Sequence, residues 1–192
     1  MKKILLTVLL ATSLSFILVI YAEEQTKKGY YVGLKLSHED NKNGSDADKW
    51  GMTFGKHLYK WLDAEIYTRT KDKDTGSNDT KLEGALIGKY KLTDSLSAYT
   101  RAGVGNKYTR NEDYGYWTVE PGLKYKLNDD WSVKAGVRFR DAFQTDHNAN
   151  DTTYKTSVGY KLTDDTSIDM GYALKRGDSK TEEFGLGLKF KF

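Results

Sequence analysis

The sequence predicts an all-β fold, a closed, antiparallel, up-and-down transmembrane β-barrel of about ten strands. From Gly29 onward, apolar residues recur at every second position, which is the side-chain period of a strand with two different faces. Glycine and charged residues occupy the positions in between. We call these two alternating sets of positions the apolar phase and the polar phase. After residue 22 the sequence contains no run of the roughly 18 apolar residues that a membrane helix needs. Eight or twelve strands are the alternatives to ten.

The first 22 residues have the pattern of an export signal. Lys2 and Lys3 precede an apolar or hydroxylated run over residues 4–20, and Ala22 offers a small residue for cleavage. We therefore expect residues 1–22 to be a signal peptide and residues 23–192 to form one barrel domain. An uncleaved membrane anchor is the alternative, but the run is slightly short for it.

Composition excludes several classes of protein. The 192 residues include 30 Lys and Arg and 27 Asp and Glu. Loss of the leader with its two lysines leaves a net charge of about +1, whereas nucleic-acid binding needs a basic excess on one face. The chain contains no cysteine, so disulfides, a lipid-modified cysteine and thiolate metal sites are impossible.

Ten strands follow from the alternating apolar residues, and an even number places both termini on the same side of a membrane. The apolar phase consists, in order, of Tyr30, Val32, Leu34 and Leu36; Trp50, Met52 and Phe54; Leu62, Ala64 and Ile66; Leu82, Leu86 and Tyr90; Leu96, Ala98, Ala102 and Val104; Trp117, Val119, Leu123 and Tyr125; Trp131, Val133, Ala135, Val137 and Phe139; Tyr154, Val158 and Tyr160; Ile168, Met170, Tyr172 and Leu174; and Phe184, Leu186, Leu188, Phe190 and Phe192.

Short and long connections alternate between these strands. Segments of the form Tyr-Lys-Leu-Thr/Asn-Asp recur every 35 residues, at 90–94, 125–129 and 160–164, so each repeat is one hairpin. The opposite connections are rich in Asp, Asn, Lys, Thr and Gly, and we expect them to be the cell-exterior loops, because such barrels have short periplasmic turns and longer outer loops. These loops are predicted near 39–48, 70–80, 109–115, 141–151 and 175–181.

One residue does not fit the strand pattern. Pro121 lies in the middle of the sixth predicted strand, although proline cannot donate a hydrogen bond to a β-ladder and a closed barrel has no edge on which to place it. We therefore expect a β-bulge at this position.

Alternation alone does not decide whether the apolar face lies inside a soluble barrel or outside a membrane barrel. Glycines such as Gly33, Gly103 and Gly136 gather on the polar phase, and small residues help where side chains converge inside a narrow barrel. Aromatic residues gather near strand ends on the apolar phase, as two interfacial girdles require. Both observations favour a lipid-facing apolar surface.

The end of the chain carries a family resemblance. Phe184, Leu186, Leu188, Phe190 and Phe192 alternate along one face up to the last residue. In this respect the sequence resembles bacterial outer-membrane β-barrel proteins, whose last strand ends in Phe and is read by the barrel assembly machinery. The resemblance implies the outer membrane of a Gram-negative bacterium as the location, with outer-membrane lipid and that machinery as partners and a monomeric barrel.

The polar phase predicts the lining of the lumen, where bases outnumber acids. The fifth to eighth strands are mainly basic, whereas the third and fourth carry Asp63, Glu65 and Glu83. Such a field favours anionic solutes, and arginine offers bidentate contacts to carboxylates. The predicted pore-lining and solute-binding residues are Lys35, Arg69, Lys89, Arg101, Lys124, Lys134, Arg138, Arg140, Lys155 and Lys175.

Residues 137–140, Val-Arg-Phe-Arg, carry a second resemblance. They are similar to the alternating basic strands of the small monomeric porins specific for oligogalacturonate, although that family has twelve strands. The expected function is passive diffusion of small hydrophilic, preferably anionic solutes such as acidic oligosaccharides, with Arg101, Lys134, Arg138 and Arg140 setting the selectivity. A non-conducting structural or surface-interaction barrel is the alternative, because charged pairs can fill a narrow lumen.

An outer-membrane enzyme is a second alternative, but its sequence support is weak. Adjacent residues of an extended chain point their side chains apart, so Asp146 and His147 do not form a dyad, and a loop exposed to solvent is the simpler interpretation. No two histidines have metal-ligand spacing. We therefore expect neither catalysis, nor a metal site, nor a cofactor.

Overall fold

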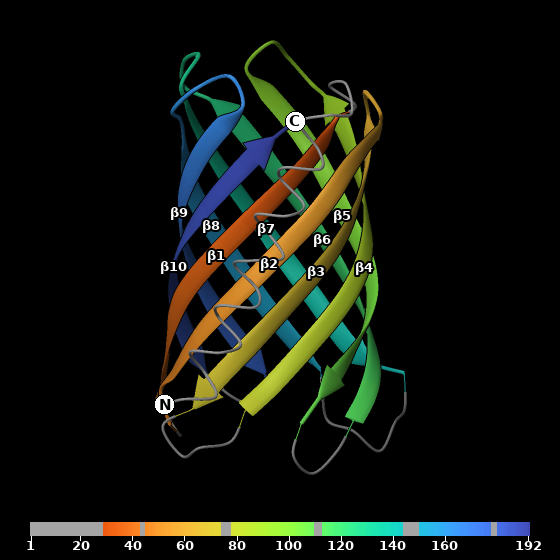
Figure 1. Ribbon diagram of the computed structural model, residues 1–192, viewed down its shortest axis with the longest axis vertical. Helices are drawn as coiled ribbons and strands as arrows, with labels where there is room; N and C mark the ends of the chain where they lie inside the picture. Colours follow the sequence, from red (N-terminus) through yellow and green to blue (C-terminus); the bar gives the residue numbers. More distant parts are fainter. Residues whose placement is uncertain (1–28, 43–44, 74–77, 110–112, 144–149, 178–179) are drawn as a thin grey trace.

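The computed structural model describes residues 29–42, 45–73, 78–109, 113–143, 150–177 and 180–192. They contain ten strands: β1 (Tyr30–Asn41), β2 (Ala47–Tyr59), β3 (Leu62–Lys73), β4 (Asn78–Lys91), β5 (Leu96–Tyr108), β6 (Asp113–Lys126), β7 (Trp131–Ala142), β8 (Asp151–Lys161), β9 (Thr166–Gly177) and β10 (Thr181–Lys191). Sequential strands pair antiparallel, and β1 also pairs with β10, which closes the barrel (Figure 1). The predicted fold class and strand number are thus confirmed. The expected signal peptide lies outside the described residues.

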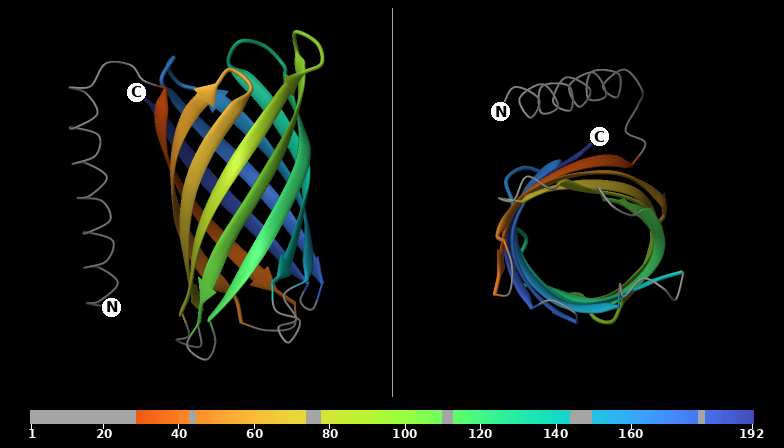
Figure 2. Two further views of the ribbon diagram at one scale, coloured as in Figure 1. Left: turned by 90° about the vertical axis from the view of Figure 1, so that its right-hand side faces the viewer. Right: turned by 90° about the horizontal axis from the view of Figure 1, so that it is seen from below.

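Strands β1 and β10 join the two ends of the wall. Their ladder runs from Tyr31 opposite Lys191 to Asn41 opposite Thr181. Beyond it, Tyr30 and Phe192 exchange backbone hydrogen bonds of 3.1 and 3.0 Å. Seen along its axis, the strands form a continuous wall (Figure 2), so backbone polar groups are paired within the sheet, as a lipid environment requires.

The tight turns at one end of the barrel explain the 35-residue repeat. Between β4 and β5, the Thr93 hydroxyl accepts hydrogen bonds from the backbone N–H groups of Ser95 (3.3 Å) and Leu96 (3.0 Å). Thr163 plays the same role between β8 and β9, and the Asn128 side chain does so between β6 and β7. Thr and Asn favour such turns because their side chains bond the backbone two or three residues on. This end is called the turn end below, and the opposite end the loop end.

Burial is reversed relative to a soluble protein. On the outer surface, Leu36, Val104 and Met170 are 67%, 59% and 61% exposed, whereas Lys49 and Glu83 on the inner face are 4% and 2% exposed. Apolar residues ordinarily occupy the interior, and a contiguous exposed apolar surface marks contact with a partner or a membrane. The outer surface is therefore suited to lipid, as the sequence predicts. The described residues include no helix long and apolar enough to cross a membrane.

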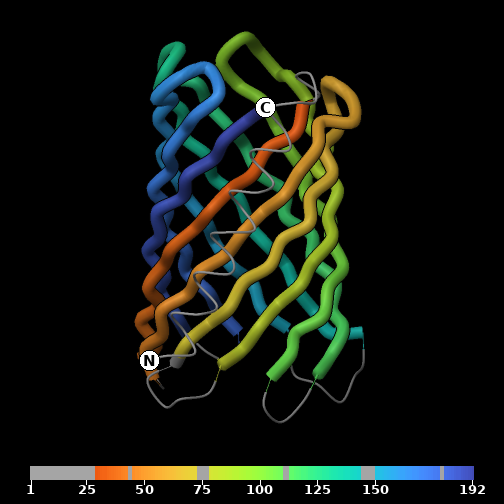
Figure 3. Tube along the Cα trace, viewed as in Figure 1, coloured from red at the N-terminus to blue at the C-terminus, as the bar shows by residue number. Residues whose placement is uncertain are grey.

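The strands extend further toward the loops than the apolar pattern predicts. β1 continues to Asn41, and β8 begins at Asp151, although both ends were assigned to loops. Glu39 still pairs in register with Glu183 on β10 and with Ala47 on β2. The strands continue because ladder hydrogen bonds depend on the backbone and not on apolar side chains. Figure 3 shows the resulting long, oblique strands.

The predicted bulge at Pro121 is wrong. Val119 lies opposite Phe139 on β7 and Gly122 lies opposite Gly136, so the register is the same on both sides of the proline and the ladder only skips residues 120–121. Proline removes one N–H donor but inserts no extra residue into the strand. A gap in the ladder therefore accommodates it without a bulge. A register shift lies on β2 instead, beside the β2–β3 turn.

Candidate functional site

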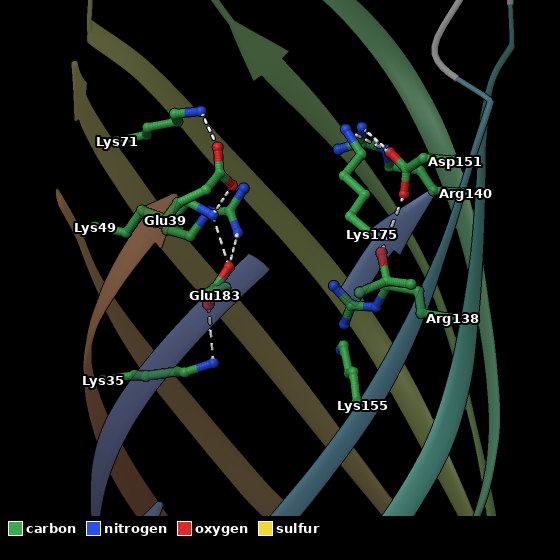
Figure 4. A network of polar contacts seen from close by, with 12 residues as sticks. Lys35, Glu39, Lys49, Lys71, Arg138, Arg140, Asp151, Lys155, Lys175 and Glu183 are labelled. Carbon is green, nitrogen blue, oxygen red and sulfur yellow. Dashed lines mark hydrogen bonds and ion pairs between the residues drawn. The ribbon is translucent and has the colours of Figure 1, made fainter. Parts of the chain in front are cut away.

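The charged side chains of the polar phase meet inside the barrel, so the lumen is the candidate site. Successive side chains of a strand point to opposite faces, and the apolar phase faces outward. Contacts between strands that are not neighbours show the inward direction. Lys71 on β3 contacts Glu39 on β1 (Figure 4), and Arg101 on β5 lies 3.3 Å from Glu65 on β3.

A cluster of six residues joins β1, β2, β3 and β10. Glu183 lies 3.1 Å from the ammonium of Lys35 and 2.6 Å from that of Lys49. The Lys49 side chain is only 2% exposed and also contacts Glu39, so two carboxylates compensate its burial, as a buried charge requires. The Glu183 cluster comprises Lys35, Glu39, Lys49, Arg69, Lys71 and Glu183. Four cations share two carboxylates, which leaves the cluster positive.

Asp151 organises a second group on β7, β8 and β9. Its carboxylate contacts the guanidinium of Arg140 and lies 3.4 Å from the Lys175 ammonium. Figure 4 shows both cations directed at this carboxylate from neighbouring strands. Here too, two cations share one acid.

Glu120 on β6 holds two further cations. Its Oε2 accepts from Arg138 Nε at 2.8 Å and from Lys155 Nζ at 2.6 Å. Arg138 also lies 4.0 Å from Glu83, which stands on β4. Glu120 thus neutralises about one of the two cations, and the remaining charge faces the lumen.

The group around Arg101 has the opposite balance from the clusters above, because two acids share one base there. Arg101 donates to Glu65 at 3.3 Å and to Glu83. Glu65 also accepts from the Tyr31 hydroxyl at 2.7 Å, and Thr118 lies 3.4 Å from Glu83. This is the most enclosed part of the lining, since Tyr31, Glu83 and Thr118 are each less than 3% exposed.

Toward the turn end, acids become sparse. Asp63 accepts from Lys89 at 2.7 Å and lies 2.6 Å from His57 Nδ1. Lys124 on β6 lies directly opposite Lys134 on β7, which places like charges side by side at a cost to stability. Among the described residues, neither of these two lysines forms an ion pair with a carboxylate. We call them the Lys124–Lys134 pair.

All ten residues predicted to line the pore belong to the inner phase of their strands. Eight of them contact a carboxylate: Lys35, Arg69, Lys89, Arg101, Arg138, Arg140, Lys155 and Lys175. The other two are the Lys124–Lys134 pair. The structure therefore divides the predicted set into bases that acids compensate and bases that they do not.

Sequence reasoning missed several members of the lining. Glu39, Lys71 and Asp151 were assigned to loops, and Tyr31 was passed over between two apolar positions. Each lies an even number of residues from an inner residue that was recognised on the same strand. Glu39, for example, follows Lys35 by four residues on β1. Extending the alternation through the polar strand ends would have found them.

A metal site and a catalytic dyad are the other kinds of site that the sequence analysis considered. Within the described ranges, no group of three His, Asp or Glu side chains is arranged to hold a metal ion. His57 contacts Asp63, which is held in turn by Lys89. Asp146 and His147, weighed above as a possible dyad, lie outside the described residues.

Comparison with known proteins gives a consistent assignment of the fold. An outer-membrane channel from Pseudomonas putida F1 has a TM-score of 0.59 and 7% identity, covering 85% of this chain and 96% of that one. The NanC porin has a TM-score of 0.51 and 11% identity, covering 84% and 100%. The KdgM porin in complex with disordered oligogalacturonate has a TM-score of 0.50 and 12% identity, covering 84% and 99%. No curated protein sequence matches the chain.

The sequence itself matches a family model over nearly its whole length. The model describes the outer-membrane protein β-barrel domain and matches residues 6–192. This match agrees with the closed barrel, its apolar outer surface and its charged interior. The chain belongs to the outer-membrane protein β-barrel family and is located in the outer membrane.

Proposed function

We propose that the barrel is a channel through which small, hydrophilic, anionic solutes diffuse passively across the outer membrane. The observation that carries this proposal is the excess of cations in the lumen, above all the Lys124–Lys134 pair, which lacks a compensating acid among the described residues. Fixed charge of one sign along a pore raises the local concentration of oppositely charged solutes.

The ion pairs reduce this positive charge without removing it. Glu120 is shared by Arg138 and Lys155, and Asp151 is shared by Arg140 and Lys175. Taken alone, each group has one more cation than acids. Arg138 links the Glu120 group to Glu83, however, so the acid-rich Arg101 group offsets its charge, whereas the Asp151 group keeps a net charge near +1. Guanidinium groups bound to one carboxylate still have free N–H donors, which a solute carboxylate can use.

Several lumen cations remain accessible to water. The side chains of Lys35 and Lys89 are 40% and 35% exposed despite their ion pairs, and Lys134 is exposed on the inner face. An anion that enters the lumen can therefore contact these ammonium groups. Their hydration also limits the strength of each contact, which suits passage rather than tight binding.

Acidic oligosaccharides are the solute class that fits this lining. They present repeated carboxylates on a hydrophilic body, which match cations spaced along a wall. The KdgM porin, similar in fold, was solved with an oligogalacturonate. With only 12% identity this likeness supports the class of solute by analogy.

The proposal also covers the oligomeric state, the partner in assembly and the absence of catalysis. The barrel works as a monomer in lipid, and the assembly machinery recognises β10 with its terminal Phe192. The ten predicted pore-lining residues bind or repel solutes but perform no covalent chemistry, so the protein is not an enzyme.

Single-channel recording in planar lipid bilayers tests the proposal. The wild-type barrel is expected to conduct with anion selectivity, measured as the reversal potential in a salt gradient. Replacing both lysines of the pair, Lys124→Gln with Lys134→Gln, is expected to lower the anion-to-cation permeability ratio by about twofold or more, because the uncompensated charge is lost.

Lys56→Gln provides the matched control. Lys56 stands on the outer surface over the Tyr30 ring, so a Lys→Gln change there, outside the lumen, should leave selectivity unchanged. A folded barrel that conducts no current would contradict the channel and favour a structural role. Equal selectivity of the double variant and the wild type would contradict the role assigned to the pair.

A further inference from the structure

The outer surface of the barrel carries an apolar groove that channel function does not explain. The groove has a volume of about 730 Å³ and crosses β5, β6, β7, β8 and β9. Small-molecule sites typically measure roughly 300–1,000 Å³. Ten of its fourteen lining residues belong to the outward phase, among them Leu123, Val137 and Tyr154, so the groove opens toward lipid. The other four are Tyr99, Lys155 and two glycines of the inward phase.

The sequence explains why the surface is hollowed here. Small residues gather in two neighbouring rows across the strands, namely Ala98, Thr100, Pro121, Ala135 and Thr156. The next row toward the turn end carries larger side chains, with Tyr125 opposite Val133 and Val158 opposite Met170. On the loop side of the groove, Phe139 lies opposite Val119. The hollow thus lies where these small residues gather, between the row of Tyr125 and Met170 on the turn side and Phe139 on the loop side.

A smaller basic pocket continues the groove at the loop end. It has a volume of about 200 Å³ and is lined by the outward residues Lys42, Arg176, Lys180 and Glu182, with Lys175 of the inward phase between them. Leu174 lines both hollows, so the two are contiguous. Three outward cations accompany one acid, which leaves the pocket positive.

Hydrogen bonds tie the two hollows together. The Tyr172 hydroxyl, at one end of the groove, donates to Glu182 Oε2 at 3.0 Å. Lys42 lies 2.8 Å from Oε1 of the same carboxylate. Through Glu182, Tyr172 of the apolar groove is therefore linked to Lys42 of the basic pocket.

We propose that this surface binds one phosphate-bearing lipid of the outer leaflet, with an acyl chain in the groove and the phosphate against Lys42, Arg176 and Lys180. A basic pocket at a membrane interface is suited to an anionic headgroup, and an apolar trough to a hydrocarbon chain. The loop end faces the cell exterior in barrels of this type, which places the headgroup in the outer leaflet.

The dimensions of the groove agree with an acyl chain. From β9 to β5 the groove spans four inter-strand steps of about 4.8 Å, or about 19 Å in total. One leaflet contributes about 15 Å of hydrocarbon. Because the strands tilt, this path runs obliquely from the loop end toward the turn end, so an extended chain can follow it within or slightly beyond one leaflet. The proposal concerns the outer surface and does not depend on conduction through the lumen.

Titration of the detergent-purified barrel with diphosphorylated lipid A, followed by native mass spectrometry, tests the site. Ala135→Trp fills the groove with a lipid-tolerant side chain and is expected to weaken binding about tenfold or more. Ala64→Trp makes the same change on the outward phase of β3, far from the groove, and should bind like the wild type.

The headgroup is tested separately. Arg176→Gln with Lys180→Gln is expected to weaken lipid A binding about fivefold or more without affecting its dephosphorylated form, whereas Lys56→Gln on the outer surface should have no effect. Heat-modifiable gel mobility verifies that each variant is folded. Equal lipid A binding by wild type and both site variants would overturn the proposal. Equal wild-type affinity for the dephosphorylated lipid, or full competition by inorganic phosphate, would overturn it as well.

Discussion

Two regions of the lumen use the same residue types differently. Around Arg101, every charged group is enclosed and has an opposite partner, and Glu83 there is 2% exposed. At the turn end, Lys124 and Lys134 face each other across neighbouring strands, and Lys134 is exposed. The first region resembles a salt-bridged core, and the second an open, charged surface.

The difference shows that carboxylates decide what a lumen cation does. A base compensated by buried acids adds little to the field in the lumen, and losing one partner destabilises the wall because the other charge stays buried without compensation. A hydrated base without an acid adds little stability but contributes its full charge to the field. Substitutions in the two regions should therefore affect different measurements.

The largest effect on stability is expected at Glu83. Glu83→Gln removes the acid that contacts Arg101 and lies 4.0 Å from Arg138. Loss of one partner of a buried pair typically costs about 3–5 kcal/mol. Urea-induced unfolding in lipid vesicles, followed by tryptophan fluorescence, should show a free energy of unfolding lowered by this amount.

Asp94→Asn is the control for Glu83→Gln. Asp94 pairs with Lys91 at 2.6 Å in an exposed turn, and the hydrogen bond from Lys91 lowers its pKa. Water already solvates both groups, so no measurable destabilisation is expected. If the two variants unfold at the same urea concentration, the enclosed region is not the stabilising network described here.

A smaller loss of stability, together with a gain in selectivity, is expected at Glu120. Glu120→Gln releases Arg138 and Lys155, whose side chains are 20% and 32% exposed and can be hydrated. The cost should be about 1–3 kcal/mol, and anion selectivity in bilayer recordings should increase. This variant converts part of the paired region into an unpaired one. A decrease in anion selectivity would show that these cations do not act on passing ions.

The sequence predicts the barrel well because its determinants are local. Alternation assigns a face to every residue, and the repeated turns at Thr93, Asn128 and Thr163 define the hairpins. The apolar pattern fails at strand ends such as Glu39, where backbone pairing continues without apolar side chains. It also fails at Pro121, because whether a missing donor produces a bulge or a gap depends on the neighbouring strand.

The site is less predictable, because pairing across the lumen joins residues far apart in the sequence. Parity places Arg101 and Arg138 inside, but only the closed wall shows that Arg101 reaches Glu65 and Arg138 reaches Glu83. Composition likewise gives an excess of bases without showing which bases lack an acid. The Lys124–Lys134 pair emerges only once the register of β6 and β7 is known.

The smallest effect on stability, with a clear effect on selectivity, is expected at Lys134. Lys134→Glu replaces a like-charge pair with an opposite-charge pair across β6 and β7, which should stabilise the barrel by about 0.2–1 kcal/mol. The same change adds a negative charge to the lumen. The reversal potential in a salt gradient should therefore show a lower anion-to-cation permeability ratio.

Replacement at a compensated site gives the matching comparison for Lys134→Glu. Lys155→Glu places a second acid beside Glu120, from which Lys155 lies 2.6 Å away in the wild type, and should destabilise the barrel while also lowering anion selectivity. If the two regions differ as described, Lys134→Glu raises the stability of the barrel and Lys155→Glu lowers it, whereas both variants lower anion selectivity. If both variants lose stability to the same extent, Lys134 has an acidic partner in solution and the distinction between the regions does not hold.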